Sequence, residues 1–361
     1  MTYKYIILIY QYIQQYTSQS HNCTNIINII KIIKMLSSKL VAFYLVIILA
    51  GVAYSRYKKS QEGNNISDDY NLVKKYLLND KSLADTRKPF LWIHIDYEVN
   101  ARNWSSWGSR NSTHLNQPYM YLTIRSIVEQ CGKSFNVVLV DDAAFSRVLP
   151  NWTIEVQNMP APLKQHLRDL AMAKVLHKYG GMTVPASFIC LKDLKPAYSA
   201  LLKGAGKTMF AGEFVSRNSA AASAAFFPDS ALMGCTKESP VMQQYITYLE
   251  PLVTGDYTNE YEFLGQNDRW LYKQLISSPP KMSMLCGTLI GTKTADGKPV
   301  VIEELLGEED VDFARGAYGI YVPADQILNR LAFQWFARLS PRQVLTSNTV
   351  VGKYLLLSND R

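Results

Sequence analysis

The chain has 361 residues, of which 48% are hydrophobic and 19% charged, values typical of a globular protein with some membrane content. Its formal net charge is +8, but residues 1–60 hold seven Lys and Arg and no acid, which leaves about +1 for the remainder. A nucleic-acid-binding domain would carry its basic excess on the folded part, so the charge distribution excludes nucleic acid as a partner.

The first 88 residues divide into three segments by composition. Residues 1–34 are rich in Ile, Tyr and Asn without regular periodicity, and we expect an unstructured tail or an over-extended start upstream of Met35. Residues 36–55 form a nearly uncharged run close to the ~20 residues that cross a bilayer, which predicts one transmembrane anchor rather than a cleaved signal peptide. Basic residues flank the run on both sides, so its orientation stays open. Residues 56–88 are polar and predict a stem.

Residues 89–361 form the predicted folded domain, and its first half alternates strands and a helix. A buried strand is expected at Phe90–Ile95, a helix at Gln117–Gln130, and a second buried strand at Asn136–Val140. Asp141 and Asp142 follow that second strand. Open α/β sheets place ligand contacts at the carboxyl ends of their strands, so Asp142 is a candidate contact to a ribose or base, with a helix N-cap as the alternative.

The stretch Leu167–Leu194 organises the centre of this domain. Apolar residues at helical spacing predict a helix that begins near Leu167 and ends at Tyr179-Gly180-Gly181, because glycine adopts the left-handed C-terminal conformation at little cost. A run rich in Val, Phe and Ile follows, and it predicts one buried strand over Met182–Leu191.

This stretch resembles the core of the DxD-type sugar-binding glycosyltransferases, the family of the yeast-type initiating mannosyltransferases and capsular sugar transferases. Family members carry Asp and Arg on a helix, then Leu, Tyr-Gly-Gly, and a strand that ends in Asp-x-Asp. The matching frame residues in this chain are Asp169, Leu176, Tyr179, Gly180, Gly181, Ile189 and Leu194. The family's Arg position is Met172, and its Asp-x-Asp positions are Pro185-Ala186-Ser187.

The resemblance implies an α/β fold: a GT-A-like, Rossmann-type nucleotide-sugar domain with a mixed central sheet. It implies nucleotide-sugar contacts at Trp92, Asp142, Asp169, Tyr179, Gly180 and Gly181. A place in the core is an equal alternative for Trp92. Further along the chain, a helix is expected at Val241–Leu252 and another near Leu264–Trp270, capped by Asn267 or Asp268. Asp268 is the candidate catalytic carboxylate of that region. An amphipathic closing helix is expected at Arg330–Ser340.

The replaced positions decide which chemistry to expect. Two carboxylates of an Asp-x-Asp hold Mn²⁺ or Mg²⁺ against the diphosphate, and the Arg adds positive charge there. Pro185 and Ser187 supply no carboxylate, so the sequence predicts no metal site unless Asp142, Asp169, Asp193 or Asp268 replaces the lost ligands. A metal-independent enzyme relying on Lys174, Arg168 or Lys192 is a second interpretation. Simultaneous loss of both charged positions favours a third, a pseudoenzyme that keeps the fold without catalysis and binds a glycan or a protein, or serves structurally. Binding of a nucleotide sugar and of a glycan acceptor remains compatible with this interpretation.

The chain also resembles degenerate members of this family encoded by large DNA viruses. That likeness implies a single-pass protein of a host endomembrane or virion membrane. It offers a non-catalytic structural or envelope-associated role as the alternative function.

Overall fold

The computed structural model describes residues 46–47, 49–54, 71–78, 87–97, 115–203, 206–255 and 259–359. The chain divides into two compact units, Met1–Asp68 and Asp69–Arg361. The tail predicted at 1–34 and most of the anchor predicted at 36–55 lie outside the described residues. Residues 49–54 are helical, and no helix in the described part of the chain has the length and apolar character to span a membrane.

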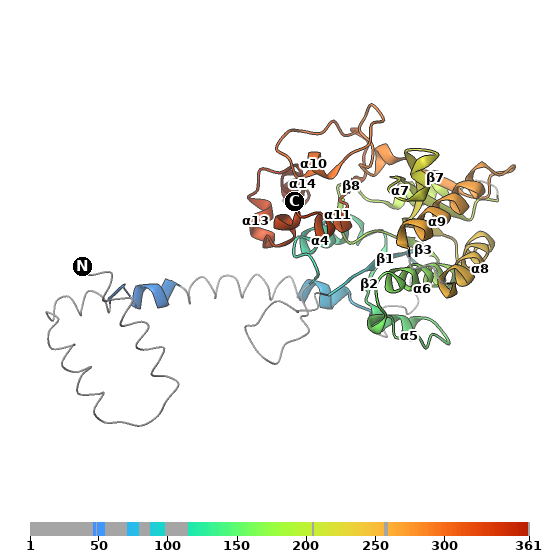
Figure 1. The fold of residues 1–361 in the computed structure, drawn as a ribbon, viewed down its shortest axis with the longest axis horizontal. Coiled ribbons are helices and arrows are strands. Elements are labelled where there is room, and N and C mark those ends of the chain that lie inside the picture. Colours follow the sequence, from blue (N-terminus) through green and yellow to red (C-terminus); the bar gives the residue numbers. More distant parts are fainter. Residues whose placement is uncertain are drawn as a thin grey trace, which may run out of the picture. The chain divides into compact units, whose positions relative to one another are not determined.

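A mixed six-stranded sheet forms the centre of the second unit (Figure 1), with the strand order β2-β1-β3-β6-β5-β7. β1 pairs in parallel with β2 and β3, β6 runs antiparallel to β3 and β5, and β7 is parallel to β5. The α/β class and the mixed central sheet expected from the sequence are therefore confirmed. The strands are β1 (Phe90–His94), β2 (Asn136–Val140), β3 (Gly181–Thr183), β5 (Met209–Val215), β6 (Phe226–Cys235) and β7 (Ser283–Leu285).

Helices cover both faces of this sheet because successive strand residues point to opposite sides. Trp92, Val138 and Val140 face one layer, and Leu91, Ile93 and Leu139 face the other. The first layer consists of α5 (Phe145–Val148), α6 (Leu163–Tyr179), α8 (Pro240–Thr254) and α9 (Glu260–Ile276). The second contains α4 (Met120–Cys131) and α7 (Lys195–Leu201). The fold is thus a sheet between two helical layers.

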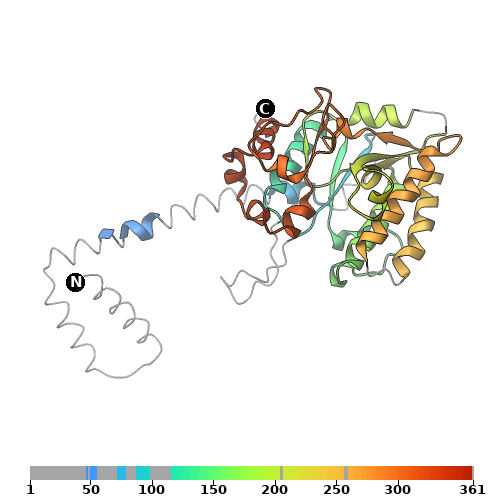
Figure 2. The same ribbon diagram turned by 45° about the horizontal axis from the view of Figure 1, so that its top comes forward.

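The C-terminal segments pack around a separate hydrophobic cluster that includes Tyr119, Ile189 and Phe336. In Figures 1 and 2 these red helices lie on the side of the second unit away from α8 and α9. The elements are β8 (Gly319–Tyr321), which pairs with β4 (Phe188–Cys190), α10 (Ile302–Leu305), α11 (Ala324–Asn329), α12 (Gln334–Ala337), α13 (Pro341–Leu345) and α14 (Val350–Asn359). Short 3-10 helices are η1 (Asp142–Ala144), η2 (Val156–Asn158), η3 (Ser219–Ala222) and η4 (Gly287–Leu289).

Three predicted elements differ from the structure. The single strand expected over Met182–Leu191 is two strands, β3 and β4, in different sheets, because a turn closed by the Phe188 amide on the Pro185 carbonyl (3.0 Å) interrupts it. Asp268 does not cap a helix: α9 has already begun at Glu260, with Asn259 as its cap. The closing helix expected at Arg330–Ser340 is only the four-residue α12.

Part of the predicted stem packs on the folded unit. Residues 71–76 are helical, and Val73 and Leu78 are buried. The Leu78 amide donates a hydrogen bond to the Leu139 carbonyl of β2 (2.9 Å). The folded unit therefore includes residues on the N-terminal side of Pro89.

Candidate functional site

A charged cluster lies where β1 and β2 end. Arg168 on α6 donates two hydrogen bonds to the Asp142 carboxylate, from Nε to Oδ1 (2.8 Å) and from Nη2 to Oδ2 (2.6 Å). Its Nη2 also donates to Asp96 Oδ1 (3.0 Å), and His94 Nε2 lies 2.9 Å from Asp142 Oδ1. We call His94, Asp96, Asp142 and Arg168 the strand-end cluster.

Both carboxylates of the strand-end cluster are paired with Arg168, and Asp142 also contacts His94. Burial opposes ionisation of Asp142, but the hydrogen bonds from His94 and Arg168 outweigh it and hold the pKa of that carboxyl well below its usual range. The Asp142 side chain is only 12% exposed, whereas that of Asp96 is 44% exposed. Asp142 is therefore the partner of Arg168, and Asp96 is the member of the cluster that faces solvent. Sequence reasoning missed Asp96, although its place two residues after β1 was a usable signal.

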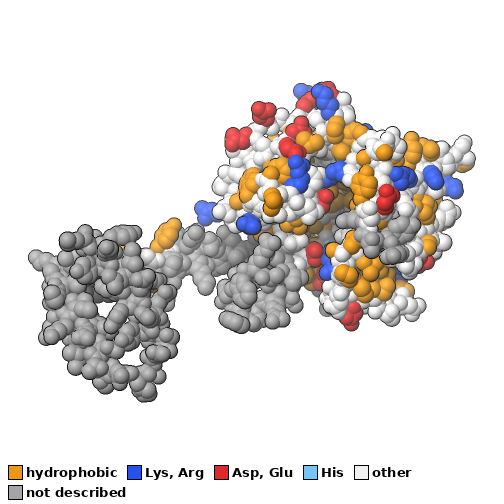
Figure 3. All heavy atoms as spheres, viewed as in Figure 1, with side chains coloured by type: hydrophobic (Ala, Val, Ile, Leu, Met, Phe, Trp, Pro, Cys, Tyr) orange, Lys and Arg blue, Asp and Glu red, His pale blue; other side chains and the backbone are white. Residues whose placement is uncertain are grey.

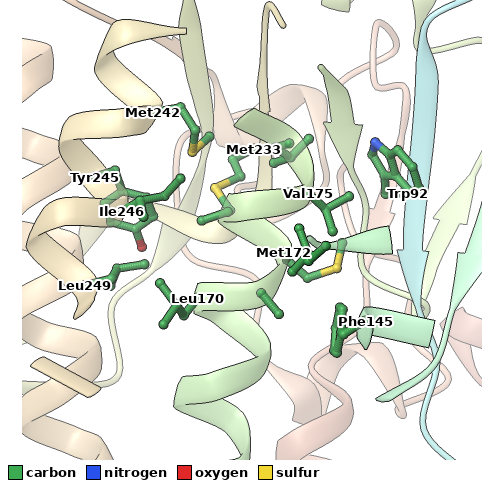
Figure 4. Packing of buried hydrophobic residues seen from close by; sticks show 14 of the residues in the cluster. Trp92, Phe145, Leu170, Met172, Val175, Met233, Met242, Tyr245, Ile246 and Leu249 are labelled. Carbon is green, nitrogen blue, oxygen red and sulfur yellow. The ribbon is translucent and has the colours of Figure 1, made fainter. Parts of the chain in front are cut away.

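The positions of the lost Asp-x-Asp form a closed turn. Ser187 is 3% exposed, and Thr123 Oγ1 donates a hydrogen bond to the Ala186 carbonyl (2.5 Å). Met172, at the family's Arg position, is 6% exposed and packs in the cluster that contains Trp92 and Phe145 (Figure 4). The replacements are thus integrated into the packing of the domain.

A second polar group contains Asp268 on α9, Asn218 at the start of η3 and Asp229 on β6. Asn218 Nδ2 donates to Asp268 Oδ2 (2.7 Å), and Asp268 is 3% exposed. Burial, followed by the neighbouring Asp229 carboxyl, raises the pKa of Asp268 to about 8, and burial also raises the pKa of Asp229. Burial first, then the nearby Asp169, raises the pKa of the buried Tyr245 well above its usual value, and Asp268 contributes in the same direction.

Strand direction relates this group to the lost Asp-x-Asp. β6 is antiparallel to β3, with Thr183 opposite Met233, so residues that precede Met233 run alongside the chain that follows Thr183. Asp229 therefore lies toward the same end of the sheet as Pro185, the end at which β3 terminates. Phe188, directly after the turn, pairs with Tyr321 of β8.

The four carboxylates considered as replacement ligands each accept a hydrogen bond within the domain. Within the described ranges, no group of three or more His, Cys, Asp or Glu side chains is arranged to hold a metal ion. Asp193 accepts hydrogen bonds from Ser134 Oγ (2.6 Å) and the Lys195 amide (3.0 Å). Asp142 is bound to Arg168, and Asp268 accepts a hydrogen bond from Asn218 Nδ2 (2.7 Å).

The proposed cationic substitutes are also occupied. Arg168 is neutralised by two carboxylates, Lys174 pairs with Glu250 (2.7 Å), and Lys192 donates to the Arg315 carbonyl (2.9 Å). Arg168 and Lys174 are therefore paired with carboxylates, whereas the acceptor of Lys192 is a neutral carbonyl that leaves its charge uncompensated.

The remaining predicted contact residues build the framework. Trp92 has no exposed surface, and its Nε1 donates to the Gly180 carbonyl (3.0 Å). Gly180 and Gly181 have φ values of 71° and 96°, which favour glycine. A Cβ on Gly181 would lie 2.2 Å from the Phe90 carbonyl oxygen. Tyr179 donates its hydroxyl to the Val148 carbonyl (2.9 Å), and Asp169 accepts from Gln165 Nε2 (3.0 Å).

Comparison with known proteins gives limited similarity. No protein-family model matches the chain, and no curated protein matches it. The apo structure of mouse xyloside xylosyltransferase 1 aligns at 11% identity and a TM-score of 0.34, covering 56% of this chain and 86% of that one. The PaToxG glycosyltransferase aligns at 11% identity and a TM-score of 0.28, covering 61% and 80% respectively. Scores at this level do not establish a shared family.

Proposed function

We propose that this chain is a glycosyltransferase-like protein that keeps a nucleotide-sugar-binding scaffold and has lost metal-dependent sugar transfer. The observation that carries the proposal is the contrast within Leu167–Leu194. Its framework is formed, with the helix α6, the Gly180-Gly181 turn and β3 in sequence. The positions at which the family carries charged residues hold the core residue Met172 and the closed turn at Pro185–Ser187.

The lost charges matter because of how the reaction proceeds. Transfer from a nucleotide sugar leaves negative charge on the departing diphosphate, and a divalent cation held by carboxylates stabilises it. A serine hydroxyl is neutral and a proline side chain offers no ligand. The scaffold would still bind the nucleotide at the carboxyl ends of β1 and β2, where Asp96 is exposed.

Isothermal titration of the full chain with UDP- and GDP-sugars, with and without Mn²⁺, tests the proposal. We expect binding of at least one of these nucleotide sugars, no gain in affinity on adding Mn²⁺, and no release of free sugar or nucleotide. Asp96→Asn should weaken binding, whereas Asp296→Asn, on an exposed turn, serves as the matched control. Turnover that requires Mn²⁺ would show an active enzyme. Absence of binding to every nucleotide sugar would favour the structural or envelope-associated role.

Membrane attachment through residues 36–55 belongs to the same proposal. It rests on the length and low charge of that run. Alkaline extraction of membranes from expressing cells should leave the full chain in the pellet and release a chain that begins at Ser60. Equal extraction of both chains would refute an integral anchor.

A further inference from the structure

A cavity of about 700 Å³ lies at the other end of α6 from the strand-end cluster. Its walls are the chain after α5, the last turns of α6, the turn between β6 and α8, and the face of α8. Lys178 lies ten residues beyond Arg168, which separates the two along the helix by about 15 Å. Cavities of this size are typical of small-molecule sites. The cavity is therefore distinct from the edge of the sheet at which a nucleotide sugar would bind.

The charges on its walls favour an anion. Lys174, His177, Lys178 and Lys237 line the cavity together with Glu238 and Glu250. Glu250 is neutralised by Lys174 (2.7 Å). Lys178 Nζ donates to the Val148 carbonyl (2.9 Å), a neutral acceptor that leaves the ammonium charge uncompensated. Lys178 and Lys237 therefore outnumber Glu238, and His177 adds a further hydrogen-bonding group beside them.

Backbone strain is concentrated at the same cavity. Asn151 (φ 62°) and Glu238 (φ 58°), the two non-glycine residues with positive φ in the described part of the chain, both line it. Such conformations cost about 1–3 kcal/mol each and cluster at ligand-binding sites. The Glu238 amide is held by the His177 carbonyl (2.7 Å), which fixes the turn that carries Lys237 over the end of α6.

Gly180 permits this close approach. A Cβ at Gly180 would lie 2.8 Å from the Lys237 amide nitrogen, so a larger residue there would displace the turn. Gly180 of the Tyr179-Gly180-Gly181 motif thus allows the turn that carries Lys237 to form one wall of the cavity. An apolar side is supplied by Leu149, Trp152 and Ile246, with the Lys174 ammonium 5.9 Å from the Trp152 ring centroid.

We propose that this cavity binds a phosphorylated ring compound, with the phosphate held by Lys178, Lys237 and His177 and the ring against the apolar side. Lysine ammonium groups act as point charges for phosphate. The ring of a nucleoside monophosphate and that of a sugar phosphate both fit this chemistry. The proposal is independent of nucleotide-sugar binding at the strand-end cluster.

Isothermal titration of the full chain with inorganic phosphate, a hexose 6-phosphate and uridine monophosphate tests it. One of the two ring compounds should bind at least tenfold more tightly than inorganic phosphate, and which one it is identifies the source. Lys237→Ala should lower that affinity at least tenfold, because it removes one of the charges that hold the phosphate. Lys237 is exposed, so its removal leaves the packing intact. Lys298→Ala, which removes an exposed lysine that does not line the cavity, should leave the affinity unchanged.

Three results would overturn the proposal. One is the absence of binding heat for all three probes at millimolar concentration. Another is an equal loss of affinity in Lys237→Ala and Lys298→Ala. The third is a loss caused by Asp96→Asn and not by Lys237→Ala, because the probe would then occupy the strand-end cluster. Nucleotide-sugar binding that survives in Lys237→Ala separates this test from that of the proposed function.

Discussion

The indole of Trp92 and the carbonyl of Gly180, 88 residues apart in sequence, are joined by a buried hydrogen bond of 3.0 Å. Trp92 lies in the middle of β1, and Gly180 ends α6 just before β3. The bond therefore ties the helix end to the neighbouring strand. Phe90 and Tyr179 pack on the same indole, with ring centroids 5.0 Å and 5.6 Å away. The hydrogen bond and the ring contacts therefore account for Trp92 in β1 without a bound ligand.

Trp92→Phe should destabilise the folded unit by about 1–3 kcal/mol, because the buried Gly180 carbonyl loses its donor. Urea denaturation followed by circular dichroism measures the change in the free energy of unfolding. Trp335→Phe is the matched control, since Trp335 is 45% exposed and its replacement should change stability by no more than about 0.5 kcal/mol. Unchanged stability in Trp92→Phe combined with weaker nucleotide-sugar binding would contradict the framework role.

The sequence predicted the central sheet well because its strands are short, buried and apolar. Asn136–Val140 is a strand with the bounds that its composition indicated, and Phe90–Ile95 is one residue longer than β1. The helix before Tyr179-Gly180-Gly181 is also confirmed, because a glycine stop is a local signal. The break at Pro185–Ser187 was missed because an apolar run does not reveal whether one strand or two strands of different sheets contain it.

The candidate site was harder to predict because its contacts are distant in sequence. Arg168 was recognised only as a substitute cation, although its partners Asp96 and Asp142 lie 72 and 26 residues away. Nothing local in the sequence reveals that an arginine on a helix faces the ends of two strands. The same holds for Asp268 and Asn218, which are 50 residues apart. The cavity beside Lys178 was missed for the same reason.

On the face of the molecule shown in Figure 3, basic and acidic side chains of the folded unit are interspersed. This distribution agrees with the near-neutral charge of the sequence after residue 60. The charges that matter for the site are therefore local pairs and single buried groups.

Arg168→Met should cost about 3 kcal/mol or more, because it leaves the Asp142 carboxylate largely buried with only His94 as a partner. The pKa of Asp142 is depressed in the folded state, so its stabilising contribution is present above the unfolded value near 3.8 and is lost as pH falls. The variant should therefore lose less stability than the wild type on acidification.

Chemical denaturation at pH 7 and at pH 3 measures both effects. Arg125→Met is the control, because Arg125 is 52% exposed and pairs with Glu129 one helical turn away, a contact worth about 0.3–0.5 kcal/mol. Adding Asp142→Asn to Arg168→Met should recover part of the lost stability. Additive losses in the double variant would contradict a direct interaction between the two side chains.

Asp268→Asn should change how stability depends on pH. The folded pKa of Asp268 is about 8 and the unfolded value is near 3.8, so between these values the folded state retains a proton that the unfolded state has released. The free energy of unfolding contributed by Asp268 is fully present below pH 4 and falls as pH rises toward 8, by up to about 1.4 kcal/mol per pH unit. The side-chain amide introduced by Asp268→Asn cannot ionise, so the variant should lack the part of the decline that Asp268 contributes. Burial also raises the pKa of the neighbouring Asp229, and the decline that Asp229 contributes is present in both proteins.

Denaturation of the wild type and of Asp268→Asn at intervals from pH 4 to pH 8 measures the difference between the two profiles. The difference is the informative quantity, because burial lowers the pKa of His166 to about 4 and His166 therefore contributes stability that rises from pH 4 to 6.5 in both proteins. Asp296→Asn, on an exposed turn, should give a profile parallel to that of the wild type. If Asp268→Asn also runs parallel, Asp268 is ionised in the folded state, and a carboxylate is available beside Asn218 and Tyr245 after all.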